Sequence, residues 1–179
     1  MELRYWSLLI FLGAIWGSAF MFIKIATPEL GAVFLVQLRL ALASLVFLPL
    51  LIRPKLLKLF MKSFKYILIL SLTNTAIPFI LFSEASNGSD SNMLAILNSS
   101  TALMTMFIAF FWLKEKITIK QVGGLILGFI GIVILVNPKN SSIDSYSALI
   151  CLAGSFCYAF SGVFIQKYCV SINKLVLIG

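Results

Sequence analysis

The sequence is dominated by long runs of apolar residues separated by short polar connections. Six such runs occupy residues 6–23, 32–52, 66–82, 93–113, 122–136 and 148–165, and a seventh begins at Leu175. A helix needs about 20 mostly apolar residues to cross a bilayer, whereas membrane strands are shorter and alternate between apolar and polar side chains. The sequence therefore predicts an all-α, multi-pass integral membrane protein whose six transmembrane helices cross the lipid bilayer.

Composition supports this prediction. Of the 179 residues, 61% are hydrophobic and only 11% are charged, whereas about a quarter of a soluble domain is charged. A soluble fold of this length could not bury so much apolar surface. Because no soluble domain is inserted between the runs, function must be located in the helix bundle itself.

Several kinds of chemistry are excluded by the residues that are missing. The chain has no histidine, which rules out a His-based proton relay, a Ser-His triad and His metal ligands. The three cysteines show no CxxC spacing and are interpreted as small apolar helix residues. No GxGxxG or P-loop pattern occurs. A membrane enzyme acting on lipid would need clustered His, Asp or Glu at one interface. We therefore expect no cofactor, no metal and no enzymatic activity.

The basic residues lie mainly on alternate connections. Eleven of the 14 Lys and Arg residues precede the first run or follow the second, fourth and sixth runs, against two on the other side and one inside a run. Basic connections stay cytoplasmic, so the N-terminus is predicted to be cytoplasmic, in the cell (inner) membrane. We interpret the basic residues behind the net charge of +8 as determinants of topology that also contact anionic lipid, not as a nucleic-acid surface. The eleven are Arg4, Arg53, Lys55, Lys58, Lys62, Lys65, Lys114, Lys116, Lys120, Lys167 and Lys174.

Part of the first run recurs in the sixth. Residues 16–24 align with residues 158–166, pairing aromatic with aromatic, small with small and Phe-Ile with Phe-Ile. In the predicted topology the first helix runs outward and the sixth inward. A five-helix unit followed by its own inverted start is the pattern of transporters with inverted-topology repeats.

Several motifs recur in order along the chain. They are Trp16–Phe20, Arg39, Ile96–Thr101, the segment Leu113–Thr118, a glycine-rich fifth helix, and Tyr158-Ala159. Together they resemble the EamA-type transporters of the drug/metabolite transporter superfamily, in which Leu113–Thr118 is similar to an LGERLT-like segment. The resemblance implies a first EamA-like repeat over residues 1–140 and the start of a second over 141–179. It also implies a secondary-active transporter that exports amino acids or related small metabolites or drugs by alternating access.

The chain departs from the family in two ways. Family members usually have ten helices, so we expect a truncated chain whose partner is a complementary C-terminal half or a second copy. Many relatives have proline in the fourth helix, where this chain reads Ser100-Thr101-Ala102-Leu103. The alternatives are an inactive fragment, a helper subunit of a split transporter, or a small multidrug-resistance-like dimeric exporter. That last mechanism calls for a carboxylate in the first helix, and residues 6–23 contain none.

Arg39 is the charge inside a predicted span. Arginine left in lipid costs at least about 2–3 kcal/mol, so we expect it to face the bundle. One hypothesis is a binding site for a carboxylate or phosphate, which guanidinium binds through two hydrogen bonds. The other is a structural pair with Glu84, or with Gln37 and helix carbonyls.

Four further residues are candidates for lining a solute site. Asn74 precedes Pro78, which cannot donate to the carbonyl of Asn74; broken hydrogen bonding at this depth indicates a cavity wall or a packing kink. Asn98 and Thr101 share one helix face with Thr105, where polar groups bind solute or join helices. Trp16 lies too deep for an interfacial belt and suits packing or a cavity wall. The predicted substrate-binding residues are Trp16, Arg39, Asn74, Asn98 and Thr101.

Overall fold

The computed structural model describes residues 3–51, 53–136, 144–170 and 172, and these residues form helices throughout, with no strand among them. The all-α prediction is confirmed. The helices are α1 (Leu3–Leu30), α2 (Ala32–Leu51), α3 (Pro54–Ser71), α4 (Ile77–Ala85), α5 (Ser91–Ser99), α6 (Thr101–Leu113), α7 (Ile119–Val136) and α8 (Ser145–Phe164), with π-helical turns η1 (Leu72–Ala76) and η3 (Ile165–Cys169).

These elements match the six predicted spans. Five helical stretches in the described residues are long and apolar enough to cross a membrane: Tyr5–Leu30, Ala32–Pro49, Pro54–Ala85, Ser91–Leu113 and Ser145–Cys169. α7 supplies a sixth, with a shorter apolar stretch at Ile119–Gly131. The run that begins at Leu175 lies outside the described residues.

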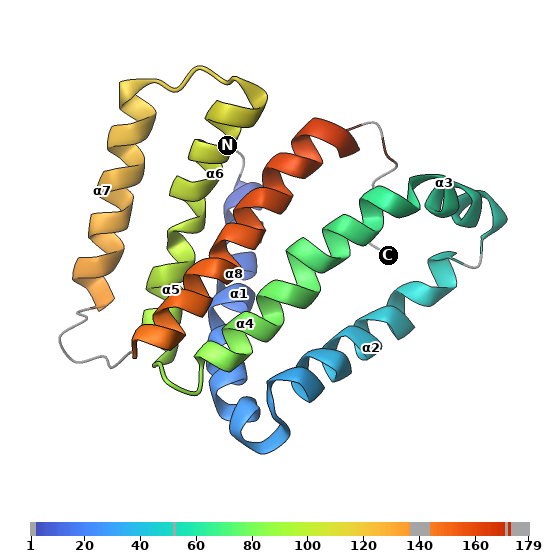
Figure 1. The fold of residues 1–179 in the computed structure, drawn as a ribbon, viewed down its shortest axis with the longest axis horizontal. Coiled ribbons are helices and arrows are strands. Elements are labelled where there is room, and N and C mark those ends of the chain that lie inside the picture. The colour runs from blue at the N-terminus through green and yellow to red at the C-terminus, as the bar shows by residue number, and fades with distance from the viewer. Residues whose placement is uncertain (1–2, 52, 137–143, 171, 173–179) are drawn as a thin grey trace.

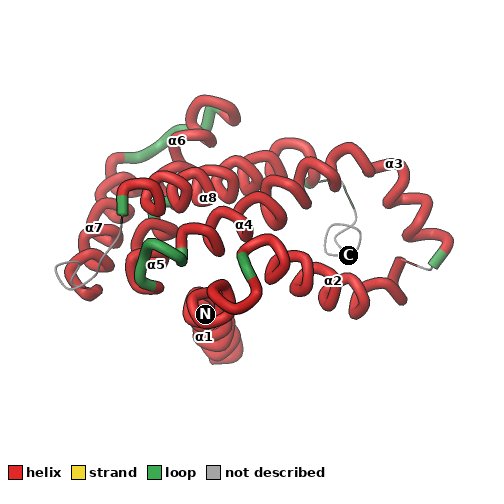
Figure 2. Tube along the Cα trace, turned by 60° about the horizontal axis from the view of Figure 1, so that its bottom comes forward, coloured by secondary structure: helices red, strands yellow, loops and turns green. Residues whose placement is uncertain are grey.

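α8 occupies the middle of the bundle. It packs between α4 and α6 and also contacts α5, while α7 and α2 lie at opposite edges of the molecule (Figures 1 and 2). α1 crosses behind, where it contacts α2, α4 and α5. Among the described helices, α8 is therefore the one surrounded by α4, α5 and α6.

The core around α8 is aromatic. The Phe82 ring of α4 meets Phe20 of α1 edge-on at 5.6 Å between centroids and stacks on Tyr158 of α8 at 5.7 Å. Leu94 and the free thiol of Cys151 are completely buried beside it. Phe82 thus joins α1, α4 and α8.

Two of the membrane-crossing helices are interrupted near the middle. Before Pro78 the helix widens into η1, where the Ile77 N–H bonds the Leu72 carbonyl five residues back. The predicted break in hydrogen bonding at Pro78 is therefore a π-helical turn, a feature frequently found at functional sites. The other interruption is at Ser100, whose N–H bonds the Leu97 carbonyl only three residues back, at 3.1 Å. This helix breaks at Ser100 without a proline.

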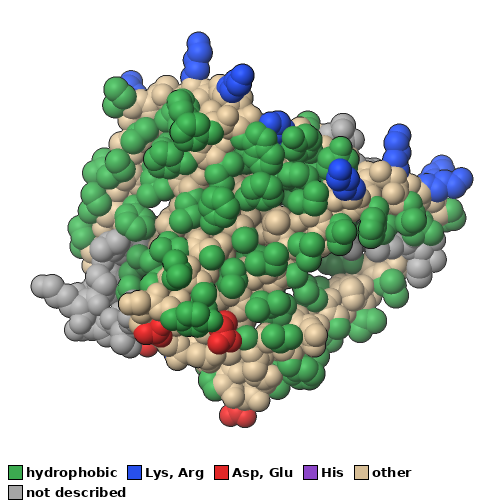
Figure 3. Space-filling view, in the orientation of Figure 1, with side chains coloured by type: hydrophobic (Ala, Val, Ile, Leu, Met, Phe, Trp, Pro, Cys, Tyr) green, Lys and Arg blue, Asp and Glu red, His purple; other side chains and the backbone are tan. Residues whose placement is uncertain are grey.

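α3 differs from the prediction. The basic connection after the second span is helical from Pro54 onward, because proline suits the first turn of a helix and its missing N–H has no partner there anyway. Lys55, Lys58, Lys62 and Lys65 recur every three or four residues, so they lie along one face. On the face that Figure 3 shows, the lysine and arginine side chains in view gather at one end of the molecule and the acidic side chains in view at the other. α3 therefore presents a basic stripe at the basic end.

The turn after α6 has a left-handed residue. Lys114 ends α6 with φ 57°, the sole positive φ among the described non-glycine residues. A left-handed residue with a side chain costs roughly 1–2 kcal/mol, and glycine avoids this cost. Lys114 therefore occupies, at a cost, a backbone conformation that glycine would adopt without strain.

Candidate functional site

Asn74 sits in η1 and faces α8. The Ser161 hydroxyl of α8 lies 2.8 Å from Asn74 Oδ1, to which it donates, and 2.9 Å from the Tyr158 carbonyl. The widened π turn changes which side chains of the helix face α8, because one extra residue is inserted into the turn. With its oxygen engaged, the Asn74 side chain still has the two hydrogens of its amide nitrogen to donate.

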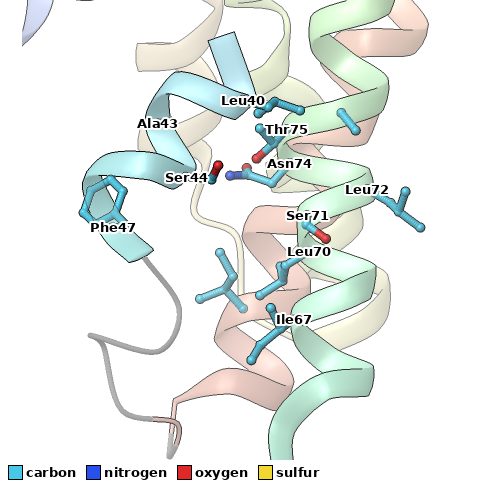
Figure 4. Close-up of a pocket in the computed structure, with 12 residues that line it drawn as sticks. Leu40, Ala43, Ser44, Phe47, Ile67, Leu70, Ser71, Leu72, Asn74 and Thr75 are labelled. Atoms are coloured by element: carbon cyan, nitrogen blue, oxygen red, sulfur yellow. The ribbon is translucent and has the colours of Figure 1, made fainter. Parts of the chain in front are cut away.

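A cavity of about 500 Å³ lies beside Asn74, between α2 and the α3–η1 helix, with Ile165 of η3 also in its wall. Ser44, Ser71, Asn74 and Thr75 supply its polar wall, and the other lining residues are apolar. In Figure 4 the Ser44 hydroxyl and the Asn74 amide nitrogen point toward one another. The structure thus places one predicted site residue in the wall of a cavity. Whether a solute binds there stays a prediction.

Arg39 faces the bundle from α2. Its guanidinium carbon lies 4.6 Å from the centroid of the Phe79 ring of α4. No ion pair with Glu84 is found in the described part of the chain. An arginine over an aromatic face is stabilised by about 2 kcal/mol when desolvated. The expected structural partner is therefore replaced by an aromatic ring, and the predicted inward direction holds in the structure.

Asn98 and Thr101 bond within their own broken helix. The Thr101 hydroxyl donates to Asn98 Oδ1 at 3.3 Å, and the Thr105 hydroxyl donates to the Thr101 carbonyl at 2.7 Å. All three side chains are half-buried. They belong to α5 and α6, whereas Asn74 belongs to η1, which lies between α3 and α4 in the chain and contacts α8, and neither Asn98 nor Thr101 lines the cavity. The structure therefore does not bring Asn98 and Thr101 to the Asn74 cavity.

Trp16 lies apart from the other predicted residues. Its side chain is 70% exposed on α1, and it does not line the cavity beside Asn74. In a membrane this face meets lipid or another helix. Of the five predicted residues, Arg39 and Asn74 share the α2–α4 region, and the remaining three lie on other faces.

Sequence reasoning missed Lys24. Its ammonium donates to the Ser86 carbonyl at 2.6 Å and to the Ser89 carbonyl at 2.8 Å, near the end of α4. The last carbonyls of a helix have no partner inside the helix and carry partial negative charge, so a lysine there is stabilising. The place of Lys24 at the end of the repeated segment is the sequence feature that could have indicated its role.

The equivalent end of α8 is also tied by polar side chains. The Gln166 amide donates to Glu115 Oε1 at 2.7 Å, and the Lys167 ammonium donates to the Trp112 carbonyl at 3.2 Å while lying 4.9 Å from the Trp112 ring centroid. These bonds join the end of α8 to the end of α6. Each copy of the repeated segment therefore ends in side chains that fasten it to a neighbouring helix.

The start of α8 is held by Asp144. Its Oδ1 accepts the Ser147 N–H at 2.8 Å and its Oδ2 accepts the Ser147 hydroxyl at 2.9 Å. The backbone hydrogen bond from Ser147, followed by the one from its hydroxyl, lowers the pKa of the Asp144 carboxyl below its usual 3.8. The Asp144 N–H donates to the Gly88 carbonyl at 3.1 Å. A Cβ at Gly88 would overlap the Asp144 carboxylate, so glycine permits this approach.

Comparisons with known proteins fit this arrangement. The sequence model of the EamA-like transporter family matches residues 4–137. An uncharacterized transporter of Archaeoglobus fulgidus is 23% identical over 141 residues, which is 79% of this chain and 50% of the relative. The chain thus spans about half the length of the curated relative that it matches. No solved structure matches the chain.

Proposed function

This chain belongs to the EamA-like transporter family, and on that premise we propose that it moves a small solute across the cell membrane as part of a secondary-active transporter. Substrates of the proposed activity are amino acids or related small metabolites or drugs, moving outward. The chain has no P-loop pattern, so a gradient would supply the energy. It is a multi-pass membrane protein of a transporter family, not of an enzyme family.

The observation that supports this proposal is the half-buried position of Arg39 on α2, together with the place of Asn74, an exposed residue of η1, in the cavity wall. A guanidinium and an amide nitrogen face the region between α2, α4 and α8, one over the Phe79 ring and the other in a cavity wall. Charged and polar groups at this depth are costly unless they have a use or a partner. We propose that both orient the solute, and that Trp16, Asn98 and Thr101 line the route on faces completed by further helices.

The domain arrangement is part of the same proposal. Residues 1–140 would form one EamA-like repeat, and residues 141–179 would begin an inverted second repeat, so that alternating access rocks one repeat against the other. The bond between Ser161 and Asn74 joins the two parts at mid-helix. The active unit would pair the chain with a complementary half or a second copy.

Orientation is tested by labelling. We propose a cytoplasmic N-terminus, because the basic end of the molecule would be retained inside. Single cysteines replacing Lys58 and Lys116, which are exposed at the basic end, should be shielded from an impermeant thiol reagent in intact cells. A cysteine replacing the exposed Asn87 should react. Ser89 is a poor probe because it is only 2% exposed. Labelling at Lys58 in intact cells would reverse the proposed orientation.

Transport is tested by reconstitution. Proteoliposomes containing this chain together with a complementary C-terminal half should transport amino acids when a proton or sodium gradient is imposed. Either part alone should not. Transport by the chain alone would instead support a dimeric half-size exporter. Normal transport in Arg39→Leu and Asn74→Leu variants of the pair would contradict the proposed solute site.

A further inference from the structure

The polar groups of the Asn74 cavity differ in what they offer a ligand. The Ser44 hydroxyl donates its one hydrogen to the Ala41 carbonyl at 2.8 Å, and the Ser71 hydroxyl donates to the Leu68 carbonyl at 3.0 Å. Both oxygens therefore keep only lone pairs for the cavity. Asn74 keeps its amide hydrogens, because its oxygen is taken by Ser161. The cavity thus presents donors and acceptors together.

The Thr75 hydroxyl can serve the cavity both as a hydrogen-bond donor and as an acceptor. Its side chain lines the cavity, and its hydroxyl bonds no other part of the described chain. The adjacent Thr73 is different, because its hydroxyl donates to the Ile69 carbonyl at 2.8 Å and it does not line the cavity. The π turn thus turns one threonine toward the cavity and leaves its near neighbour bonded to its own helix.

Among the described residues, those that line the cavity carry no charge. Arg39 precedes the lining residue Leu40, but its guanidinium lies over the Phe79 ring. A carboxylate or ammonium group in this cavity would lose water without gaining an opposite charge, which is costly. An amide or hydroxyl group would meet a donor at Asn74 and acceptors at Ser44 and Ser71. The volume of about 500 Å³ lies within the range of about 300–1,000 Å³ usual for small-molecule sites.

We infer that this cavity is a binding subsite for the uncharged amide or hydroxyl group of a small solute, whose apolar body lies against the aliphatic wall. Asn74 donates to the solute, Ser44 and Ser71 accept from it, and Thr75 does either. The inference rests on the proposed transport function and names the chemical class recognised at one end of the solute.

The test uses a matched pair of probes on the whole chain in lipid nanodiscs. 4-Methylpentanamide is neutral, and 4-methylpentanoate carries a carboxylate on the same skeleton. A cysteine replacing Ala43, which lines the cavity, reports occupancy through its rate of alkylation by N-ethylmaleimide. Mass spectrometry separates this site from the native cysteines. A cysteine replacing Leu45, which is 64% exposed and does not line the cavity, is the control.

The amide should slow alkylation at position 43 and leave position 45 unchanged, and the carboxylate should protect neither. Thr75→Val should raise the half-protecting concentration of the amide about fivefold, which corresponds to one net hydrogen bond, and Thr73→Val should leave it unchanged. Equal protection by the carboxylate, or equal effects of the two threonine variants, would overturn the subsite. Because this assay needs no transport, absent protection alongside gradient-driven transport by the reconstituted pair would reject the subsite alone. Protection without transport would reject the transport function alone.

Discussion

α1 and α8 contain the repeated segment, yet they are packed differently. In the most apolar 18-residue window of the α8 span, 39% of the residues are buried, whereas in that of α1 only 6% are buried. Tyr158 of α8 stacks on Phe82, whereas Trp16, which aligns with it 142 residues earlier, is 70% exposed. Ser161 bonds Asn74, and the aligned residue in α1 is Ala19, which has no hydroxyl.

The difference teaches that neighbours, not the segment itself, decide its packing. α8 lies between α4 and α6, and α1 crosses behind the bundle (Figure 1). In water an exposed apolar helix would be driven to associate, but lipid is as apolar as leucine and supplies no such drive. α1 is therefore held by a small number of specific contacts, those of Phe20 and Lys24 among them.

The largest expected effect comes from removing the Phe82 ring, which packs against both α1 and α8. Phe82→Ala should lower the free energy of unfolding by about 2–3 kcal/mol, because the contacts of the ring are lost. The same substitution in a water-soluble core costs about 3–5 kcal/mol, since there the transfer of the ring out of water also contributes. Phe22→Ala, at a ring that is 68% exposed on α1, should change it by under about 0.5 kcal/mol. Unfolding in mixed detergent micelles measures both. Equal losses would show that α1 is as well packed as α8.

A second prediction adds volume to the two helices. A Cβ at Gly154 of α8 would approach a Phe82 ring carbon to 3.0 Å, whereas one at Gly17 of α1 would meet nothing within 4 Å. Gly154→Leu should therefore cost about 1–3 kcal/mol through overpacking, and Gly17→Leu should be neutral or stabilising in the chain alone. The thermal midpoints of the two purified variants provide the measurement. A Gly17→Leu protein as unstable as Gly154→Leu would reveal a covered α1 face.

The third prediction compares the aligned residues that end the two copies. Lys24→Met removes a charged donor from two carbonyls and should cost about 1–2 kcal/mol, since hydrogen bonds to charged groups are the stronger ones. Gln166→Met removes one bond at an exposed site and should cost under about 1 kcal/mol. The same unfolding assay ranks them. The reverse order would mean that the polar contacts of α8 hold it more than its packing does.

The smallest effect concerns the start of α8, which Asp144 caps. Since the folded state lowers the pKa of the Asp144 carboxyl, its stabilisation is present above pH 3.8 and is lost as the pH falls through the lower folded value. Wild type should be more stable than Asp144→Asn at pH 6, and the difference should shrink as the pH is lowered below 3.8. A difference that does not change with pH would assign the effect to something other than ionisation.

Much of the fold could be predicted from the periodicity and length of the apolar runs. The sequence placed six helices correctly, and Pro78 marked the break that became η1. The helical basic segment was missed because Lys55, Lys58, Lys62 and Lys65 were counted as charges in a connection, although their spacing indicates one helix face. The sequence also predicted that Arg39 faces inward, since lipid excludes it. Phe79 as its partner was not predictable, because an aromatic ring in an apolar run looks like any other.

The sequence by itself determined that the chain is a helical membrane protein of the EamA-like transporter family, because apolar length, missing charge and ordered motifs are properties of local sequence. Only the tertiary structure decided that α8 is enclosed and α1 is exposed, that Asn74 meets Ser161, and that Ser44 and Thr75 share a cavity with Asn74. Local rules say which residues must avoid lipid. They do not say which helix will cover them, because the contacts join residues such as Asn74 and Ser161 that lie far apart in the chain and depend on the whole packing arrangement.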